Sequence, residues 1–222
     1  MRLFAGLLLA YTGTALAVGT SLETDSEKYS YAIGVNFAQS LLRQGVPIDA
    51  DAVYMALQDS LSGGDLRLTA DVMSDALRAE AQRAGERKRA MAGENLKRGK
   101  DFMAQNKDKE GVTTLPNGIQ YEVLRKGDGE QPTSKDSVTV HYVGSLIDGQ
   151  EFDSSRRRGE PASFPLGNVI KGWQEVLPLM RVGSRWLVTI PPDLAYGVNG
   201  AGAAIGPNET LVFEIELLSV EK

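Results

Sequence analysis

The fold depends most on one stretch, Leu166-Gly167-Asn168-Val169-Ile170-Lys171-Gly172-Trp173. It places two β-branched aliphatic residues beside a glycine and a tryptophan, among many turn-forming residues. Tryptophan has a large, flat apolar surface whose only polar group is one N–H. Where glycine lets the backbone turn, such a ring is either a plug in the hydrophobic core or the floor of an apolar pocket.

The residues on either side of this stretch have the period-two alternation of β-strands. Strands are predicted at residues 119–123, 137–143, 150–152, 185–190 and 210–218. Asp148-Gly149 is a tight-hairpin signal between the second and third of them. Between the later strands only residues 171–180 fit a helix, and Pro178 limits its length. The pattern predicts an α+β domain in which a curved antiparallel sheet wraps around one short helix.

The residues before this domain predict helices instead of strands. Thr24 and Glu27 have the spacing of a capping box, and apolar residues then recur at every fourth position from Tyr29 to Leu41. Short helices of this kind bury little surface alone, so their apolar stripe is expected to pack against a second copy of itself. Residues 18–68 are therefore expected to form an all-helical domain through which the chain makes a homodimer.

Residues 69–110 are expected to form a long connecting helix. They are rich in Ala, Arg, Lys, Glu and Asp, contain no proline, and have few apolar positions. Acidic residues are interleaved with the basic run Arg87-Lys88-Arg89, which favours a solvated surface over a patch for membranes or nucleic acid. The glycines at 85, 93 and 99 weaken the helix and allow it to bend. The pattern is typical of a spacer.

The first residues have the pattern of a secretory signal peptide. An arginine is followed by the apolar run Leu3-Phe4-Ala5-Gly6-Leu7-Leu8-Leu9-Ala10, which closes on the small residues of Thr14-Ala15-Leu16-Ala17. The run is too short to span a bilayer durably, and the alternative is a buried N-terminal helix. We expect residues 1–17 to be a signal peptide that exports the chain to the periplasm, with association with the outer membrane left open.

Composition excludes several classes of chemistry. The net charge of −5 gives no electrostatic reason to expect nucleic acid as a partner. With no cysteine and a single histidine, His141, the sequence predicts no metal site, no disulfide and no thiol nucleophile. Alternation places His141 opposite Tyr142, which predicts a histidine at the surface or one that only supports a site residue. The run Gly200-Ala201-Gly202-Ala203-Ala204 is followed by a strand and not by a helix, which argues against a phosphate loop. No cofactor is expected.

What remains is an aromatic and aliphatic set. It comprises Tyr142, Phe152, Phe164, Val169, Ile170, Trp173, Tyr196, Ile205 and Phe213. Most of these residues lie in runs that resemble those of the FKBP-type peptidyl-prolyl cis-trans isomerases. The runs are Val138-Thr139-Val140-His141-Tyr142-Val143-Gly144, Phe152-Asp153-Ser154-Ser155, Val169-Ile170-Lys171-Gly172-Trp173, Ile190-Pro191-Pro192, Ala195-Tyr196-Gly197 and Leu211-Val212-Phe213-Glu214-Ile215-Glu216-Leu217. The resemblance covers residues 111–222. The arrangement of signal peptide, helical part and long helix resembles the periplasmic macrophage infectivity potentiator-like subgroup.

The resemblance implies a rotamase, an isomerase that assists the folding of exported proteins as a chaperone. The implied binding residues are Trp173 as the pocket floor and Phe152, Phe164, Val169, Ile170, Ile205 and Phe213 around it. Asp153, Tyr196 and Tyr142 are implied as catalytic groups, with Arg158 orienting Asp153. Because rotation makes no bond to the enzyme, we expect the apolar pocket to act by desolvating the amide, without covalent chemistry. The implied partners are proline-containing unfolded or partly folded polypeptides, a second copy of the chain, and the macrolide inhibitors of the family.

Two other functions stay open at this point. One is a holdase-type chaperone or binding module, in which the pocket only grips proline segments and a cleft between the N-terminal arms holds unfolded chains. The other, a surface virulence or adhesion factor, rests on analogy with the subgroup alone. The aromatic neighbours favour the pocket floor over the core plug for Trp173.

Overall fold

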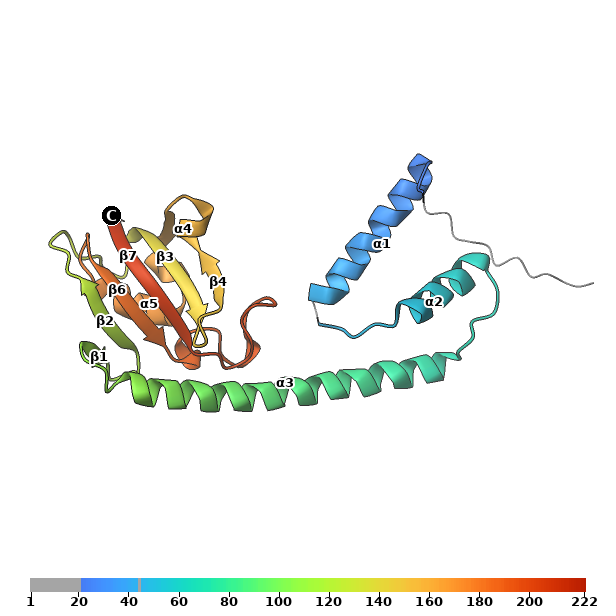
Figure 1. Cartoon of the computed structure of the whole chain (residues 1–222), viewed down its shortest axis with the longest axis horizontal. Helices are drawn as coiled ribbons and strands as arrows, with labels where there is room; N and C mark the ends of the chain where they lie inside the picture. Colours follow the sequence, from blue (N-terminus) through green and yellow to red (C-terminus); the bar gives the residue numbers. More distant parts are fainter. Residues whose placement is uncertain (1–20, 44) are drawn as a thin grey trace, which may run out of the picture. The chain divides into compact units, whose positions relative to one another are not determined.

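The computed structural model describes residues 21–43 and 45–222 (Figure 1). The expected signal peptide, residues 1–17, lies outside them. The chain divides into two compact units at the boundary between Ile48 and Asp49. Within the described residues, no helix combines the length and the apolar character needed to cross a membrane.

The first unit contains the helix α1 (Asp25–Arg43). Its start is the predicted capping box: the Thr24 N–H donates to Glu27 Oε2 at 2.8 Å, and the Glu27 N–H donates to Thr24 Oγ1 at 3.2 Å. No residue of α1 is buried, and the side chains of Ile33 and Phe37 are 52% and 50% exposed. The apolar stripe is thus uncovered in a single chain.

The second unit opens with two helices, α2 (Ala50–Ser62) and α3 (Ala70–Asn106). Asp49 caps α2 by accepting from the Ala52 N–H at 3.0 Å, and Gly63 ends it in the left-handed conformation, with φ 69°. The 37 residues of α3 correspond to a length on the order of 55 Å. Its buried residues, Asn95, Gly99 and Asn106, all lie in its C-terminal third.

The rest of the second unit is a curved antiparallel sheet (Figure 1). The spatial order is β1 (Val112–Thr114), β2 (Gln120–Arg125), β6 (Arg185–Ile190), β7 (Leu211–Glu221), β3 (Ser137–Leu146) and β4 (Glu151–Ser154), while β5 (Ala162–Pro165) also pairs with β3. β4 and β5 share the same edge of β3, opposite residues 143–145 and 137–140. Burial alternates strictly along β3, which confirms the period-two prediction there. Two short strands, β1 and β5, were not predicted.

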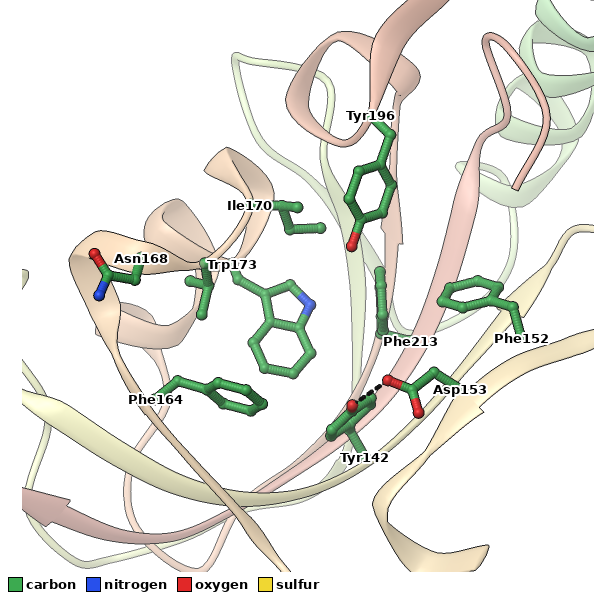
Figure 2. Close-up of a pocket in the computed structure, with 10 residues that line it drawn as sticks. Tyr142, Phe152, Asp153, Phe164, Asn168, Ile170, Trp173, Tyr196 and Phe213 are labelled. Carbon is green, nitrogen blue, oxygen red and sulfur yellow. Dashed lines mark hydrogen bonds between the residues drawn. The ribbon is translucent and has the colours of Figure 1, made fainter. Parts of the chain in front are cut away.

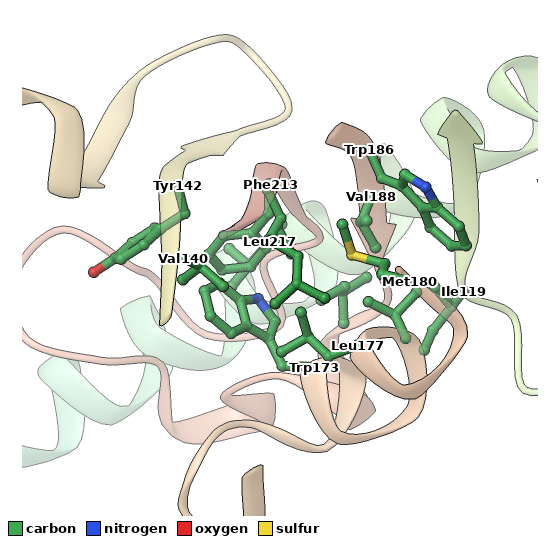
Figure 3. Close-up of a cluster of buried hydrophobic side chains, with 14 of the residues drawn as sticks. Ile119, Val140, Tyr142, Trp173, Leu177, Met180, Trp186, Val188, Phe213 and Leu217 are labelled. Atoms are coloured by element: carbon green, nitrogen blue, oxygen red, sulfur yellow. The ribbon is translucent and has the colours of Figure 1, made fainter. Parts of the chain in front are cut away.

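The concave face of the sheet encloses the predicted short helix, α5 (Lys171–Val176), which continues into the 3₁₀ turn η2 (Leu177–Leu179). α5 approaches the sheet closely because Gly172 has no side chain: a Cβ there would lie 2.5 Å from Ile190 Cγ2. Trp173, Val176, Leu177 and Met180 then pack with the inward-facing residues of β3, β6 and β7 (Figure 3). The remaining turns are α4 (Ser155–Arg158), η1 (Leu166–Asn168), η3 (Pro192–Leu194) and η4 (Gly197–Asn199). The α+β class, with helices before the sheet, is confirmed.

Candidate active site

A pocket of about 310 Å³ opens at one end of the sheet, beside α5 (Figure 2). Its lining residues are Tyr142, Phe152, Asp153, Phe164, Asn168, Val169, Ile170, Trp173, Tyr196 and Phe213. They come from β3, β4, β5, η1, α5, β7 and the loop between β6 and β7. The stretch from Leu166 to Trp173 contributes four of them, because η1, the start of α5 and the residues between them all border the pocket.

Trp173 is the floor of this pocket and also part of the core. It is only 4% exposed, and its ring meets Tyr142, Phe164 and Phe213 edge-on, with centroid distances of 5.3, 5.9 and 5.4 Å. Such edge-to-face contacts fix the ring orientation. The indole N–H is buried and makes no hydrogen bond to any described residue. Trp173 is therefore both a plug in the hydrophobic core and the floor of the pocket.

One wall depends on a glycine in β3. A Cβ on Gly144 would lie 2.6 Å from Phe152 Cε2 and 2.8 Å from Phe213 Cε1. Without it, the two phenyl rings meet edge-on, with centroids 5.6 Å apart. The wall formed by β4 and β7 therefore depends on the absence of a side chain at Gly144. In the sequence alone, Gly144 is identified only as one residue of a motif run.

The polar side of the pocket is a cluster of three residues, Asp153, Tyr142 and Arg158. The Tyr142 hydroxyl and the Arg158 guanidinium each donate to a different oxygen of the Asp153 carboxylate, and Arg158 Nη2 also donates to the Tyr142 oxygen at 3.0 Å. Burial alone would raise the pKa of Asp153, but these hydrogen bonds and the Arg158 charge outweigh it and lower the pKa below its usual value. Burial, followed by the hydrogen bond to Asp153, raises the pKa of Tyr142. At neutral pH the site therefore holds a carboxylate beside a protonated phenol.

Tyr196 lies across the pocket from this cluster. It is 40% exposed, and its hydroxyl points into the pocket (Figure 2). Burial and the negative charge of Asp153 raise its pKa, so it is a hydrogen-bond donor at neutral pH. At the rim, the Ile170 carbonyl accepts from the backbone N–H groups of Trp173 and Gln174 at 2.9 and 3.2 Å. The Ile170 N–H itself has no backbone partner among the described residues, so it remains a donor for a ligand.

Ile205 and Asn168 differ from the sequence-based expectation, whereas His141 lies on the side of β3 that was expected. Ile205 does not line the pocket: it is 7% exposed and pairs with Ala201 in a β-bridge. Asn168 lines the pocket and was not predicted as a site residue, although it belongs to the opening stretch. His141 faces away from Tyr142, with Nδ1 3.1 Å from Ser155 Oγ. Across residues 21–43 and 45–222, no group of three His, Asp or Glu side chains is arranged to hold a metal ion.

Comparison with known proteins gives consistent matches over both parts of the chain. A family model described as FKBP-type peptidyl-prolyl cis-trans isomerase matches residues 128–218, and one for the domain amino-terminal to it matches residues 26–123. The outer membrane protein MIP of Legionella longbeachae is 44% identical over 95% of this chain and 92% of its own length. The FKBP-type 22 kDa peptidyl-prolyl cis-trans isomerase of Escherichia coli is 44% identical, with 90% and 98% covered. The crystal structure of FkpA from Escherichia coli superposes with a TM-score of 0.64 at 35% identity, covering 90% of this chain and 99% of that one.

Proposed function

The chain belongs to the FKBP-type peptidyl-prolyl cis-trans isomerases, and on that premise we propose that the pocket above Trp173 binds the proline ring of a polypeptide and isomerises the preceding bond by desolvation. The observation that supports this most is the floor itself: one buried indole held edge-on by three aromatic rings, with the hydrogen-bonded pair of Tyr142 and Asp153 on one side. A flat, dry surface of this kind fits an apolar ring.

Rotation about an X–Pro bond is slow because it breaks amide resonance, with a barrier of about 18–20 kcal/mol. The twisted amide has less charge separation than the planar one, so it loses less on leaving water. A dry pocket therefore favours the twisted form over the ground state, which is differential binding of the transition state. No group of the enzyme needs to form a bond with the substrate.

The polar groups of the pocket have two roles: some donate hydrogen bonds to the substrate, and one holds a pocket side chain in place. The donors are the Tyr196 hydroxyl and the Ile170 N–H, which can hold the substrate carbonyl oxygens on either side of the proline. An ionised carboxylate only accepts, so Asp153 cannot donate to a carbonyl oxygen. We assign Asp153 the task of fixing Tyr142 at the pocket edge and setting the local potential, with Arg158 holding the carboxylate in orientation.

The N-terminal part supports a proposal about assembly and location. We propose that residues 18–68 dimerise, residues 69–110 connect, and residues 111–222 catalyse. The exposed stripe of α1 supports dimerisation, since a second copy would remove the side chains of Ile33 and Phe37 from water. A signal peptide at residues 1–17 would deliver the chain to the periplasm, where it would assist the folding of exported proteins. One relative is named an outer membrane protein, which is consistent with an outer-membrane association.

The test is a refolding assay whose rate is limited by a cis-trans proline bond. The wild type is expected to accelerate refolding. Asp153→Ala is expected to be slower than the wild type by about tenfold and Tyr196→Phe by about threefold, the factors that correspond to a net hydrogen-bond contribution of about 0.5–1.5 kcal/mol. The alternative, a binding module, is favoured by the same exposed apolar stripe on α1. It would be supported by a wild type that suppresses aggregation of the refolding substrate without accelerating the proline-limited phase.

A further inference from the structure

One face of α3 docks on the isomerase domain through polar residues. Asn95, Gly99 and Asn106 are the buried residues of this helix, and their spacings of four and seven place them on one side. We call these three residues the α3 seam. Asn95 Nδ2 donates to the Pro207 carbonyl at 3.0 Å, and Asn106 Nδ2 donates to Gln120 Oε1 at 2.9 Å.

The middle of the seam needs a glycine. A Cβ on Gly99 would overlap Thr210 Oγ1 and lie 3.1 Å from the Thr210 Cβ. Thr210 is only 1% exposed and directly precedes β7. The helix and the end of the β6–β7 loop are therefore in direct contact at this point.

Three hydrogen bonds join α3 to one loop, residues 197–208, which follows Tyr196. Lys88 Nζ donates to the Asn199 carbonyl at 3.4 Å. Asn95 holds Pro207 of the loop, and Asn208 Nδ2 reaches back to the Ala92 carbonyl of α3 at 3.3 Å. The Asn208 N–H in turn donates to the Gly197 carbonyl at 2.8 Å. Asn208 therefore links α3 to the residue beside Tyr196.

The backbone conformation of the loop 197–208 explains why its contacts with α3 matter. Asn208 has φ 55°, a left-handed conformation that asparagine tolerates better than most residues. Gly197, Gly200 and Gly202 also have positive φ, and residues 202–204 are exposed. A loop with so many flexible residues does not hold a fixed shape by local preference alone.

We propose that α3 positions Tyr196 for isomerisation by holding the loop 197–208, with Asn95 and Asn208 as positioning residues. The connecting helix is then part of the support of the active site and not only a spacer. This rests on the proposed function, in which Tyr196 donates to the substrate. Asn106, the third residue of the seam, instead forms its hydrogen bond with Gln120 of β2, away from the loop.

The experiment compares three variants of the full chain: Asn95→Ala, Asn208→Gly and Asn106→Ala. Asn208→Gly keeps the left-handed conformation accessible and removes only the amide that reaches α3. Asn106→Ala is the matched control, because it also deletes a buried amide of α3 but away from the loop. With an X–Pro peptide, Asn95→Ala and Asn208→Gly are expected to lower kcat by about two- to threefold, no more than Tyr196→Phe does, with KM nearly unchanged. Asn106→Ala is expected to leave kcat unchanged.

A double-mutant cycle tests whether the effect passes through Tyr196. In a Tyr196→Phe background, Asn208→Gly is expected to cause little further loss. Full additivity, or an equal loss of kcat in Asn106→Ala, would overturn the proposal.

Hydrogen exchange provides a readout that does not depend on activity. Amides of residues 197–208 are expected to exchange faster in Asn95→Ala and Asn208→Gly, while those of β3 stay protected. Unchanged exchange in this loop would overturn the proposal as well. An inactive wild type would instead overturn the proposed function, and the exchange result would still decide whether α3 holds the loop.

Discussion

Replacing Trp173 with alanine is expected to reduce activity and stability together, because the ring belongs to the pocket and to the core. The side chain is 4% exposed and is held edge-on by three aromatic rings. A buried tryptophan removes about 200 Å² from water, which at about 25 cal/mol per Å² corresponds to about 5 kcal/mol. Since the ring also lines the pocket, water can replace part of it, and we expect a loss of about 3–4 kcal/mol.

Trp186 offers a matched control in the same domain. It is 7% exposed and stacks on Tyr121 with centroids 4.3 Å apart, but it does not line the pocket. Urea unfolding gives the loss of stability of Trp173→Ala and Trp186→Ala, and an X–Pro peptide assay gives kcat/KM. Both variants are expected to lose a few kcal/mol, while only Trp173→Ala loses kcat/KM by about tenfold or more. If the alanine variants do not fold, the two Trp→Phe variants allow the same comparison with smaller stability losses.

Two results would refute this reasoning in different ways. A Trp173→Ala protein that is inactive but as stable as the wild type would show that the contribution of the ring to the core is overestimated. Equal losses of activity in the two tryptophan variants would show that lowered stability, and not the pocket floor, determines activity.

Gly99→Ala is expected to lower the melting temperature, because the new Cβ would overlap a buried threonine hydroxyl, whereas Gly93→Ala has open space around it and should stabilise α3 by about 0.5–1 kcal/mol. Asp153 has a lowered pKa in the folded state, so its stabilising contribution is present above its unfolded value of about 3.9 and is lost as pH falls through the folded value. Urea midpoints of the wild type should therefore fall more steeply than those of Asp153→Asn below about pH 4, and a parallel decline would contradict the carboxylate network. Phe37→Asp is expected to yield monomers in sedimentation, because it places a charge in the stripe of α1, while Gln39→Asp on the same helix should stay dimeric.

Much of the sheet was predictable because one face of each long strand is buried. Strict alternation along β3 follows from that geometry, and the hairpin at Asp148-Gly149 follows from its turn residues, with Gly149 at φ 89°. β1 and β5, of three and four residues, are too short to establish a period. Pro178 did not end the helical segment abruptly: the chain tightens into the 3₁₀ turn η2 around it.

The part of the candidate site formed by aromatic and aliphatic motif residues was predictable. The part that depends on how a loop and a helix pack was less so. The motif runs contained eight of the ten lining residues. Phe164 was predicted as part of the aromatic set, and Asn168 was not predicted. The position of Ile205 depends on how the loop after Tyr196 folds back, which no residue pattern specifies, and it pairs with Ala201 away from the pocket. The seam of α3 was missed because a face made of asparagine and glycine has no hydrophobic period.

That polar face changes the interpretation of the glycines in α3. Gly99 is needed for close approach to Thr210, so it contributes contact and not flexibility. Contacts between α3 and the isomerase domain begin with Lys88 Nζ at the Asn199 carbonyl, 3.4 Å away, and continue to Asn106. Residues 88–106 are therefore held along the domain, which leaves the part of α3 that contains Gly85 as the place where the helix can bend.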